Sequence, residues 1–93
     1  MENNLFISYE INSSNKNDNK IVEEIKKLGA WASIQKFMWF AKSSLSSEEV
    51  ANKVYSHMTE GDTLIVINTT TNDAYWYNLS DEVAQHMQNY WHQ

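Results

Sequence analysis

The pattern of hydrophobic and polar positions divides the chain into short segments, beginning with a strand and a helix. Residues 4–11 are rich in β-forming side chains and lead into a polar loop, which predicts a strand. Over residues 21–28, apolar positions recur at helical spacing with charged positions between them, and Gly29 follows. This pattern predicts an amphipathic helix that is capped by Asn17 or Asp18.

The next part of the chain predicts a β-ribbon and a second helix. Residues 30–43 carry many aromatic side chains without a helical period, which favours two strands that bend near residues 33–36. Ser46 and Glu49 have the spacing of a capping box, in which each side chain bonds to the other residue's backbone N–H. The helix that follows presents an inner stripe of Val50, Ala51, Val54, Tyr55 and Met58.

The C-terminal part predicts two more strands and a third helix. Glu60-Gly61-Asp62 is a turn, and the continuous apolar run 63–68 is typical of a covered strand. Residues 73–78 hold an aromatic strand, and Ser80 caps the last helix. We expect the apolar residues of this helix to point inward, namely Val83, Ala84, Met87, Tyr90 and Trp91.

The order of elements is β-α-β-β-α-β-β-α, which predicts a single α+β domain over residues 1–93. It matches the ferredoxin-like βαββαβ arrangement with an extra C-terminal strand and helix. The first and fourth strands are expected in the middle of the sheet, and both main helices on one face. The opposite face then needs a cover, which a second subunit in a symmetric homodimer would provide.

Composition and charge narrow the possible functions. The chain has 93 residues, a formal net charge of −5 and no cysteine, so disulfides and thiolate zinc sites are excluded. The N-terminus has no signal pattern and no apolar run is long enough to cross a bilayer, so we expect a cytoplasmic protein without membrane contact. The chain has no arginine, which argues against strong nucleic-acid binding.

Several short patterns together resemble one known family. They are a first strand ending Tyr9-Glu10-Ile11, a helix ending Leu28-Gly29, and the Asp-x-Leu-x-Val-Ile pattern at 62–67. The aromatic ribbon with Trp31, Gln35, Phe37 and Trp39 and the Ser-capped second helix complete the pattern. Over residues 4–79 the chain is similar to the small CRISPR-associated spacer-acquisition subunit, the second Cas protein, and its compact bacterial and phage relatives.

The resemblance implies a ferredoxin-like homodimer whose first strands end near the two-fold axis. In family members described as metal-dependent nucleases, an aspartate closing that strand is supplied by each subunit and the pair holds a metal. Glu10 stands at the matching position. The longer side chain moves the carboxylate by about an ångström, which disturbs a tight magnesium shell, and Lys16 and Lys20 stand where arginines often follow. A solvated strand-end carboxylate is therefore favoured over a catalytic one.

Two other site hypotheses concern the aromatic residues and the histidines. Tyr9, Trp31 and Trp39 predict a nucleotide-binding module at the dimer seam, although aromatics in short strands more often form core or interface. Among the histidines, only His86 has an acid, Glu82, at the spacing that puts two ligands on one helix face. Solvated histidines are favoured, so we predict no metal site.

These observations favour a small, acidic, non-catalytic binding or inhibitory protein. We expect it to engage a protein that handles nucleic acid, in the contest between phage and host defence, by presenting DNA-like negative charge. The alternative is a ribonuclease or deoxyribonuclease that uses Glu10 from each subunit with Mg²⁺ or Mn²⁺; otherwise we expect no cofactor. The residues predicted to face the partner are the acids of the C-terminal half: Glu48, Glu49, Glu60, Asp62, Asp73, Asp81 and Glu82.

Overall fold

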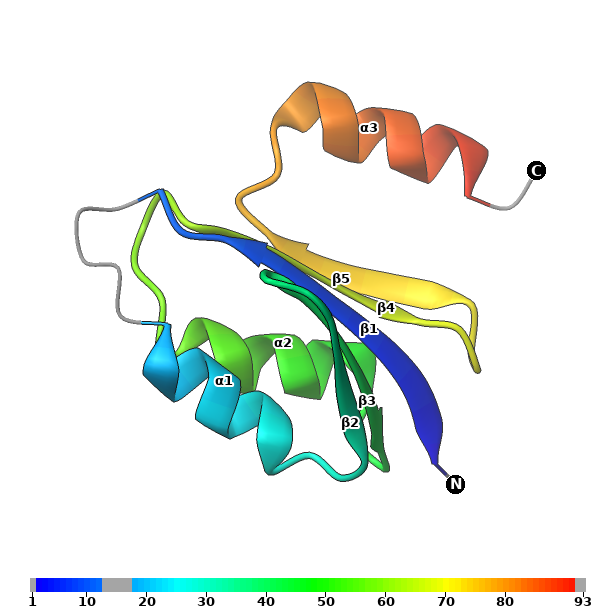
Figure 1. Cartoon of the computed structure of the whole chain (residues 1–93). Coiled ribbons are helices and arrows are strands. Elements are labelled where there is room, and N and C mark those ends of the chain that lie inside the picture. Colours follow the sequence, from blue (N-terminus) through cyan, green and yellow to red (C-terminus); the bar gives the residue numbers. More distant parts are fainter. Residues whose placement is uncertain (1, 13–17, 92–93) are drawn as a thin grey trace.

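A five-stranded antiparallel sheet with three helices organises the fold (Figure 1). The structure is a computed structural model that describes residues 2–12 and 18–91. Its elements follow the predicted order, and their bounds are β1 (Asn3–Glu10), α1 (Asn19–Lys26), β2 (Trp31–Gln35), β3 (Met38–Ser43), α2 (Ser47–Tyr55), β4 (Thr63–Asn68), β5 (Asp73–Tyr77) and α3 (Asp81–Tyr90). None of these helices is long and apolar enough to cross a membrane.

The strands lie in the order β2-β3-β1-β4-β5, and every neighbouring pair is antiparallel. The central strand is β1, in which Phe6 lies opposite Phe40 of β3 on one side and Ile67 of β4 on the other. The two ends of the sheet, β2 and β5, each pair with one strand only.

One face of the sheet packs against α1 and α2, which lie side by side on the same side of it (Figure 1). Alternate residues of β1, β3 and β4 point to this face because successive side chains of a strand lie on opposite faces. The core that results is closed to solvent. It consists of Leu5, Ile7, Tyr9, Ile21, Ile25, Trp39, Ala41, Val50, Ala51, Val54, Leu64 and Val66.

Local signals place the helix ends. The predicted capping box is confirmed, since the Glu49 N–H donates to Ser46 Oγ at 3.1 Å and the Ser46 N–H donates to Glu49 Oε1 at 3.0 Å. Asp18 is the N-cap of α1, although its side chain makes no capping bond; Asn17 lies outside the described residues. After α1, a Cβ added to Gly29 would lie 2.1 Å from the Lys42 carbonyl oxygen, so only glycine fits.

The third helix corrects part of the expectation that its apolar residues point inward, because Ala84, Met87 and Trp91 are half-buried whereas Val83 and Tyr90 are exposed. It lies on the opposite side of the sheet from α1 and α2 (Figure 1), and none of its residues is buried. Val83 and Tyr90 are 48% and 57% exposed. The apolar side of α3 is wider than the part that contacts the sheet. Trp91, which follows α3, links the end of the helix to the residues before β5, because its Nε1 donates to the Asn72 carbonyl oxygen at 2.9 Å.

Candidate functional site

The carboxylate predicted for a metal lies at the end of the central strand. Glu10 is exposed on the sheet face opposite α1 and α2, because it follows Phe6 and Ser8 in the alternation of β1. It borders a hollow of about 380 Å³, together with Ser8, Phe37 and Thr63 among others. In residues 2–12 and 18–91, no three His, Cys, Asp or Glu side chains gather where they could hold a metal ion.

Two of the three residues predicted to bind a nucleotide belong to the core instead. Tyr9 is 3% exposed and Trp39 is 7% exposed, so neither offers a ring face on which a base could stack. Burial raises the pKa of the Tyr9 hydroxyl and Asp18 adds to the rise, whereas the Trp39 indole acts in the opposite direction. Only Trp31 is accessible, and Lys26 Nζ lies 4.7 Å from its ring centroid.

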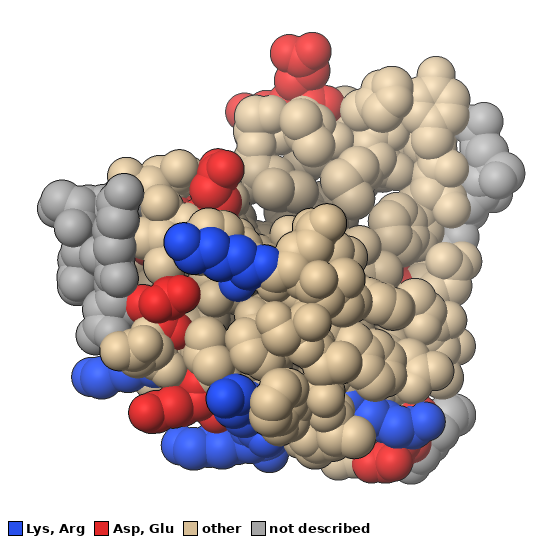
Figure 2. Space-filling model, in the orientation of Figure 1, with Lys and Arg blue, Asp and Glu red and all other residues tan. Residues whose placement is uncertain are grey.

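The acids predicted to face a partner do not form one array. Glu48, Glu49 and Asp73 lie near the N-terminus of α2, since Ser47 donates to Asp73 Oδ1 at 2.7 Å. The remaining exposed acids, Glu60, Asp81 and Glu82, lie toward the other end of the strands, where β4 begins and β5 ends. In Figure 2, charged side chains form small separate groups on the visible side of the molecule.

Asp62 must be removed from the partner-facing set. It is 2% exposed, and its carboxylate accepts hydrogen bonds from the backbone N–H of Asn12 at 2.8 Å and of Thr59 at 3.0 Å. It also accepts a bond from Thr59 Oγ1. These bonds join the end of β1 to the turn before β4, so this acid has a structural role that its sequence position in a polar turn did not reveal.

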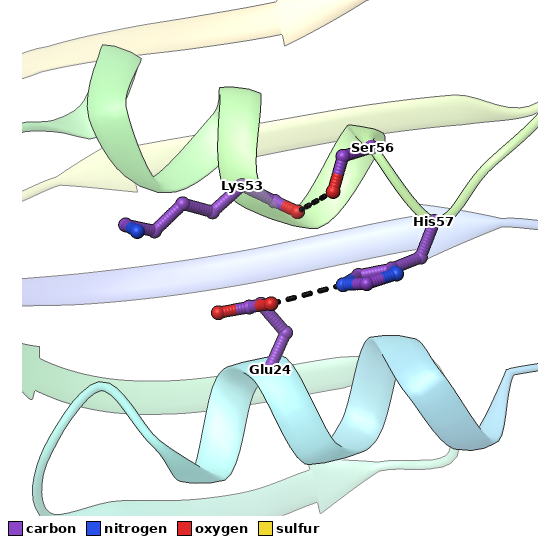
Figure 3. A network of polar contacts seen from close by, with 4 residues as sticks. All are labelled: Glu24, Lys53, Ser56 and His57. Carbon is purple, nitrogen blue, oxygen red and sulfur yellow. Dashed lines mark hydrogen bonds and ion pairs between the residues drawn. The ribbon is translucent and has the colours of Figure 1, made fainter.

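A contact between the two helices of the core was also missed from the sequence. His57 follows α2, and its Nε2 lies 2.9 Å from Glu24 Oε1 of α1 (Figure 3). The Ser56 hydroxyl donates to the Lys53 carbonyl oxygen beside it (Figure 3). His57 therefore joins the helices instead of standing in solvent. His86 contacts the Tyr90 ring at 4.9 Å between centroids, and His92 lies outside the described residues.

The second face of the sheet, which we call the open face, is an incompletely covered apolar surface. Its side chains alternate with those of the core, and all of its large apolar members are half-buried. Phe6 and Phe40 contact each other with ring centroids 5.5 Å apart. The large apolar residues of the open face are Phe6, Met38, Phe40, Ile65, Ile67 and Trp76.

The helix α3 covers the open face only in part. A pocket of about 230 Å³ remains between β5 and the helix, lined by Trp76, Met87 and Trp91 among others. Ala84 and Met87 are half-buried, whereas Val83 and Tyr90 extend the apolar surface into solvent. The open face and the exposed side of α3 together form one apolar surface. The sequence analysis did not predict which residues make up this surface.

Comparisons with known proteins place the chain in a family. No curated protein and no solved structure matches it, so the resemblance to the CRISPR-associated spacer-acquisition subunit stays a prediction. The model of the family described as "Protein of unknown function (DUF3884)" matches residues 5–76, which is most of the chain and extends from β1 into β5. The chain belongs to the DUF3884 family.

Proposed function

We propose that this protein is a non-catalytic binding protein that works as a homodimer joined through its open face. The observation that carries the proposal is the set of six large apolar side chains left half-buried on one side of the sheet. Exposed apolar surface that is contiguous in this way marks a binding site more often than a free surface. The strand order and the two helices on one face support a ferredoxin-like scaffold with β5 and α3 added.

A second copy is the occupant because the open face is complementary to itself. Its centre is apolar and uncharged, while Glu10 lies at one end of it and Lys42 at the other, across β1 and β3. A two-fold axis that reverses the strand direction places Glu10 of each copy toward Lys42 of the other. A stable contact of this kind covers about 800 Å² on each partner, with an apolar centre and a polar rim.

The same geometry gives Glu10 a role without chemistry. A nuclease of the predicted kind would assemble its metal site from Glu10 of both subunits, because within one chain the described residues bring no three His, Cys, Asp or Glu side chains together. An ion pair at the rim of a dimer instead needs one exposed carboxylate facing one exposed cation, which Glu10 and Lys42 offer. The binding of a nucleic-acid-handling partner by the acidic residues stays a prediction. These residues divide between the two ends of the sheet and therefore form no single array.

Sedimentation equilibrium tests the dimer. The wild-type protein is expected to form dimers, and Phe40→Asp is expected to weaken them about a hundredfold because it places a charge in the apolar centre. Lys53→Gln makes the same one-unit change in charge at an exposed position of α2, away from the open face. This variant serves as the control and should leave the dimer intact. A wild-type protein that stays monomeric at about 100 μM would contradict the proposal.

Charge reversal tests the pairing of Glu10 with Lys42. Glu10→Lys alone is expected to weaken the dimer about four- to twenty-fivefold, because the two-fold axis creates two equivalent pairs and each surface ion pair contributes about two- to fivefold. The double variant with Lys42→Glu should recover the wild-type affinity. In parallel, labelled RNA and DNA are incubated with Mg²⁺ or Mn²⁺ and the protein; cleavage that is lost in Glu10→Ala would overturn the non-catalytic assignment.

A further inference from the structure

The edge strand β2 is exposed along its whole length and offers a backbone edge, which is distinct from the side chains of the open face. It ends the sheet, pairs with β3 alone, and all five of its residues are exposed. Its sequence, Trp-Ala-Ser-Ile-Gln, contains no proline and no charge. Proline and charged residues usually protect an edge strand, because its unpaired backbone groups attract other strands. This edge lacks that protection.

The backbone of β2 specifies what can occupy it. The Ala30 carbonyl oxygen accepts a hydrogen bond from the Lys42 N–H at 2.8 Å, so in the antiparallel alternation Ala32 also faces β3. The N–H and C=O groups of Trp31 and Ser33 therefore point outward. The pairing register shifts between Ser33 and Gln35, which ends the regular part of the edge. Outward backbone groups at alternate residues are the pattern with which an extended strand pairs.

The segment that forms β2 and β3 is opposite in charge to the whole chain. Residues 30–43, which hold β2 and β3, contain Lys36 and Lys42 and no acid, although the chain carries a net charge of −5. Lys26 of α1 extends its Nζ over the Trp31 ring. Trp31 and Ile34 are 46% and 48% exposed and supply apolar contacts along the strand.

We propose that the β2 edge binds an extended, acidic segment of a partner protein, which adds a sixth strand to the sheet. Backbone hydrogen bonds to Trp31 and Ser33 hold the segment, and its acids face the lysines. The other edge fits this role less well, because β5 begins with Asp73 and its remaining side chains are half-buried. The proposal does not depend on the homodimer, since the segment binds the outer backbone edge of β2 whereas the dimer buries side chains of the open face.

A short peptide of alternating valine and glutamate, blocked at both ends, serves as the probe. Titration into the ¹⁵N-labelled protein should move the amide signals of β2 more than those of the open face. Hydrogen exchange at the Trp31 and Ser33 amides should be fast in the free protein and slow in the complex, whereas Ala32 should be protected in both. Slow hydrogen exchange at the Trp31 and Ser33 amides in the absence of the peptide would overturn the proposal. So would amide signal shifts that are confined to the open face.

Variants separate the backbone and charge contributions. Ser33→Pro removes an outward N–H without removing a bond to β3, and should weaken binding about tenfold or more. Ser33→Thr keeps the N–H and is the matched control. Because Ser33→Pro could perturb the strand, a peptide with its inward amides N-methylated is tested on the wild-type protein and should bind equally poorly.

The charge arm uses two comparisons. Replacing every glutamate of the peptide by glutamine should weaken its binding to the wild-type protein. The Lys26→Gln and Lys36→Gln double variant should bind the glutamate peptide more weakly than the wild type does, and the glutamine peptide equally well. Raising the salt concentration should reduce the difference between the two peptides. Equal binding of both peptides, or equal binding by wild type and Ser33→Pro, would contradict the proposal.

Discussion

Phe6 and Ile7 are neighbours on the central strand, yet they lie on opposite faces of the sheet in different surroundings. Ile7 is completely buried under α1 and α2. Phe6 is half-buried on the open face, where α3 crosses without burying any residue of its own. The covered face explains why the chain folds, whereas the open face carries apolar surface beyond what the described fold needs. This difference is the basis for assigning the open face to binding.

The largest expected effect comes from truncating matched isoleucines on the two faces. Ile7→Ala should lower the free energy of unfolding by about 2–5 kcal/mol, because it leaves a cavity in a closed core. Ile65→Ala, on the open face of neighbouring β4, should cost about half as much in the monomer, because part of its side chain already contacts water. Urea unfolding at low protein concentration measures both values. Equal losses would show that the open face is packed as tightly as the core.

A second matched pair compares the helices. Val54 of α2 is completely buried and Val83 of α3 is 48% exposed. Val54→Ala should lower the free energy of unfolding by about 1.5–3 kcal/mol, since it removes buried apolar groups. Val83→Ala should change it by less than about 0.5 kcal/mol. Thermal and urea unfolding of the two variants make the comparison, and a large loss for Val83→Ala would mean that α3 is an integral part of the core.

The smallest effect concerns pH and the capping of α2. The Ser46 backbone N–H, and then its hydroxyl, lower the pKa of Glu49 below its ordinary value. A carboxylate with a lowered folded-state pKa adds stability above its unfolded pKa of about 4.3, and that stability is lost as the pH falls through the folded value. The wild-type protein should therefore exceed Glu49→Gln in stability at pH 7, and the gap should narrow at pH 3. Urea midpoints at both pH values provide the test; a gap that is independent of pH would contradict it.

Local sequence signals predicted the elements because each depends on near neighbours. The strand over residues 63–68 has the predicted bounds, and Ser46 with Glu49 forms the expected capping box. Contacts between distant residues were not predictable in the same way. His57 contacts Glu24, which lies 33 positions away in the chain. The Asp62 carboxylate accepts a hydrogen bond from the backbone N–H of Asn12, which lies 50 positions away, after β1. Neither contact has a signature in a short window of sequence.

The candidate site shows the same limit. Alternation along the strands predicts that one face carries apolar residues opposite the core, and the notion of a face needing cover followed from the order of elements alone. The position of α3 depends on how its stripe meets that face, which a helical period does not determine. Tyr9 and Trp39 stayed candidates for nucleotide binding beside the favoured core or interface interpretation, because a sequence of strand residues does not state which alternate set the helices cover.

Intermolecular contacts measured by NMR show whether two copies meet through the open face. A mixed sample of isotope-labelled and unlabelled protein is used for filtered nuclear Overhauser spectra. Contacts between copies are expected from the Phe6 ring to the Ile65 methyl groups and from the Phe40 ring to the Met38 methyl group. A dimer whose intermolecular contacts avoid these four residues, or a sample without any intermolecular contact, would contradict it.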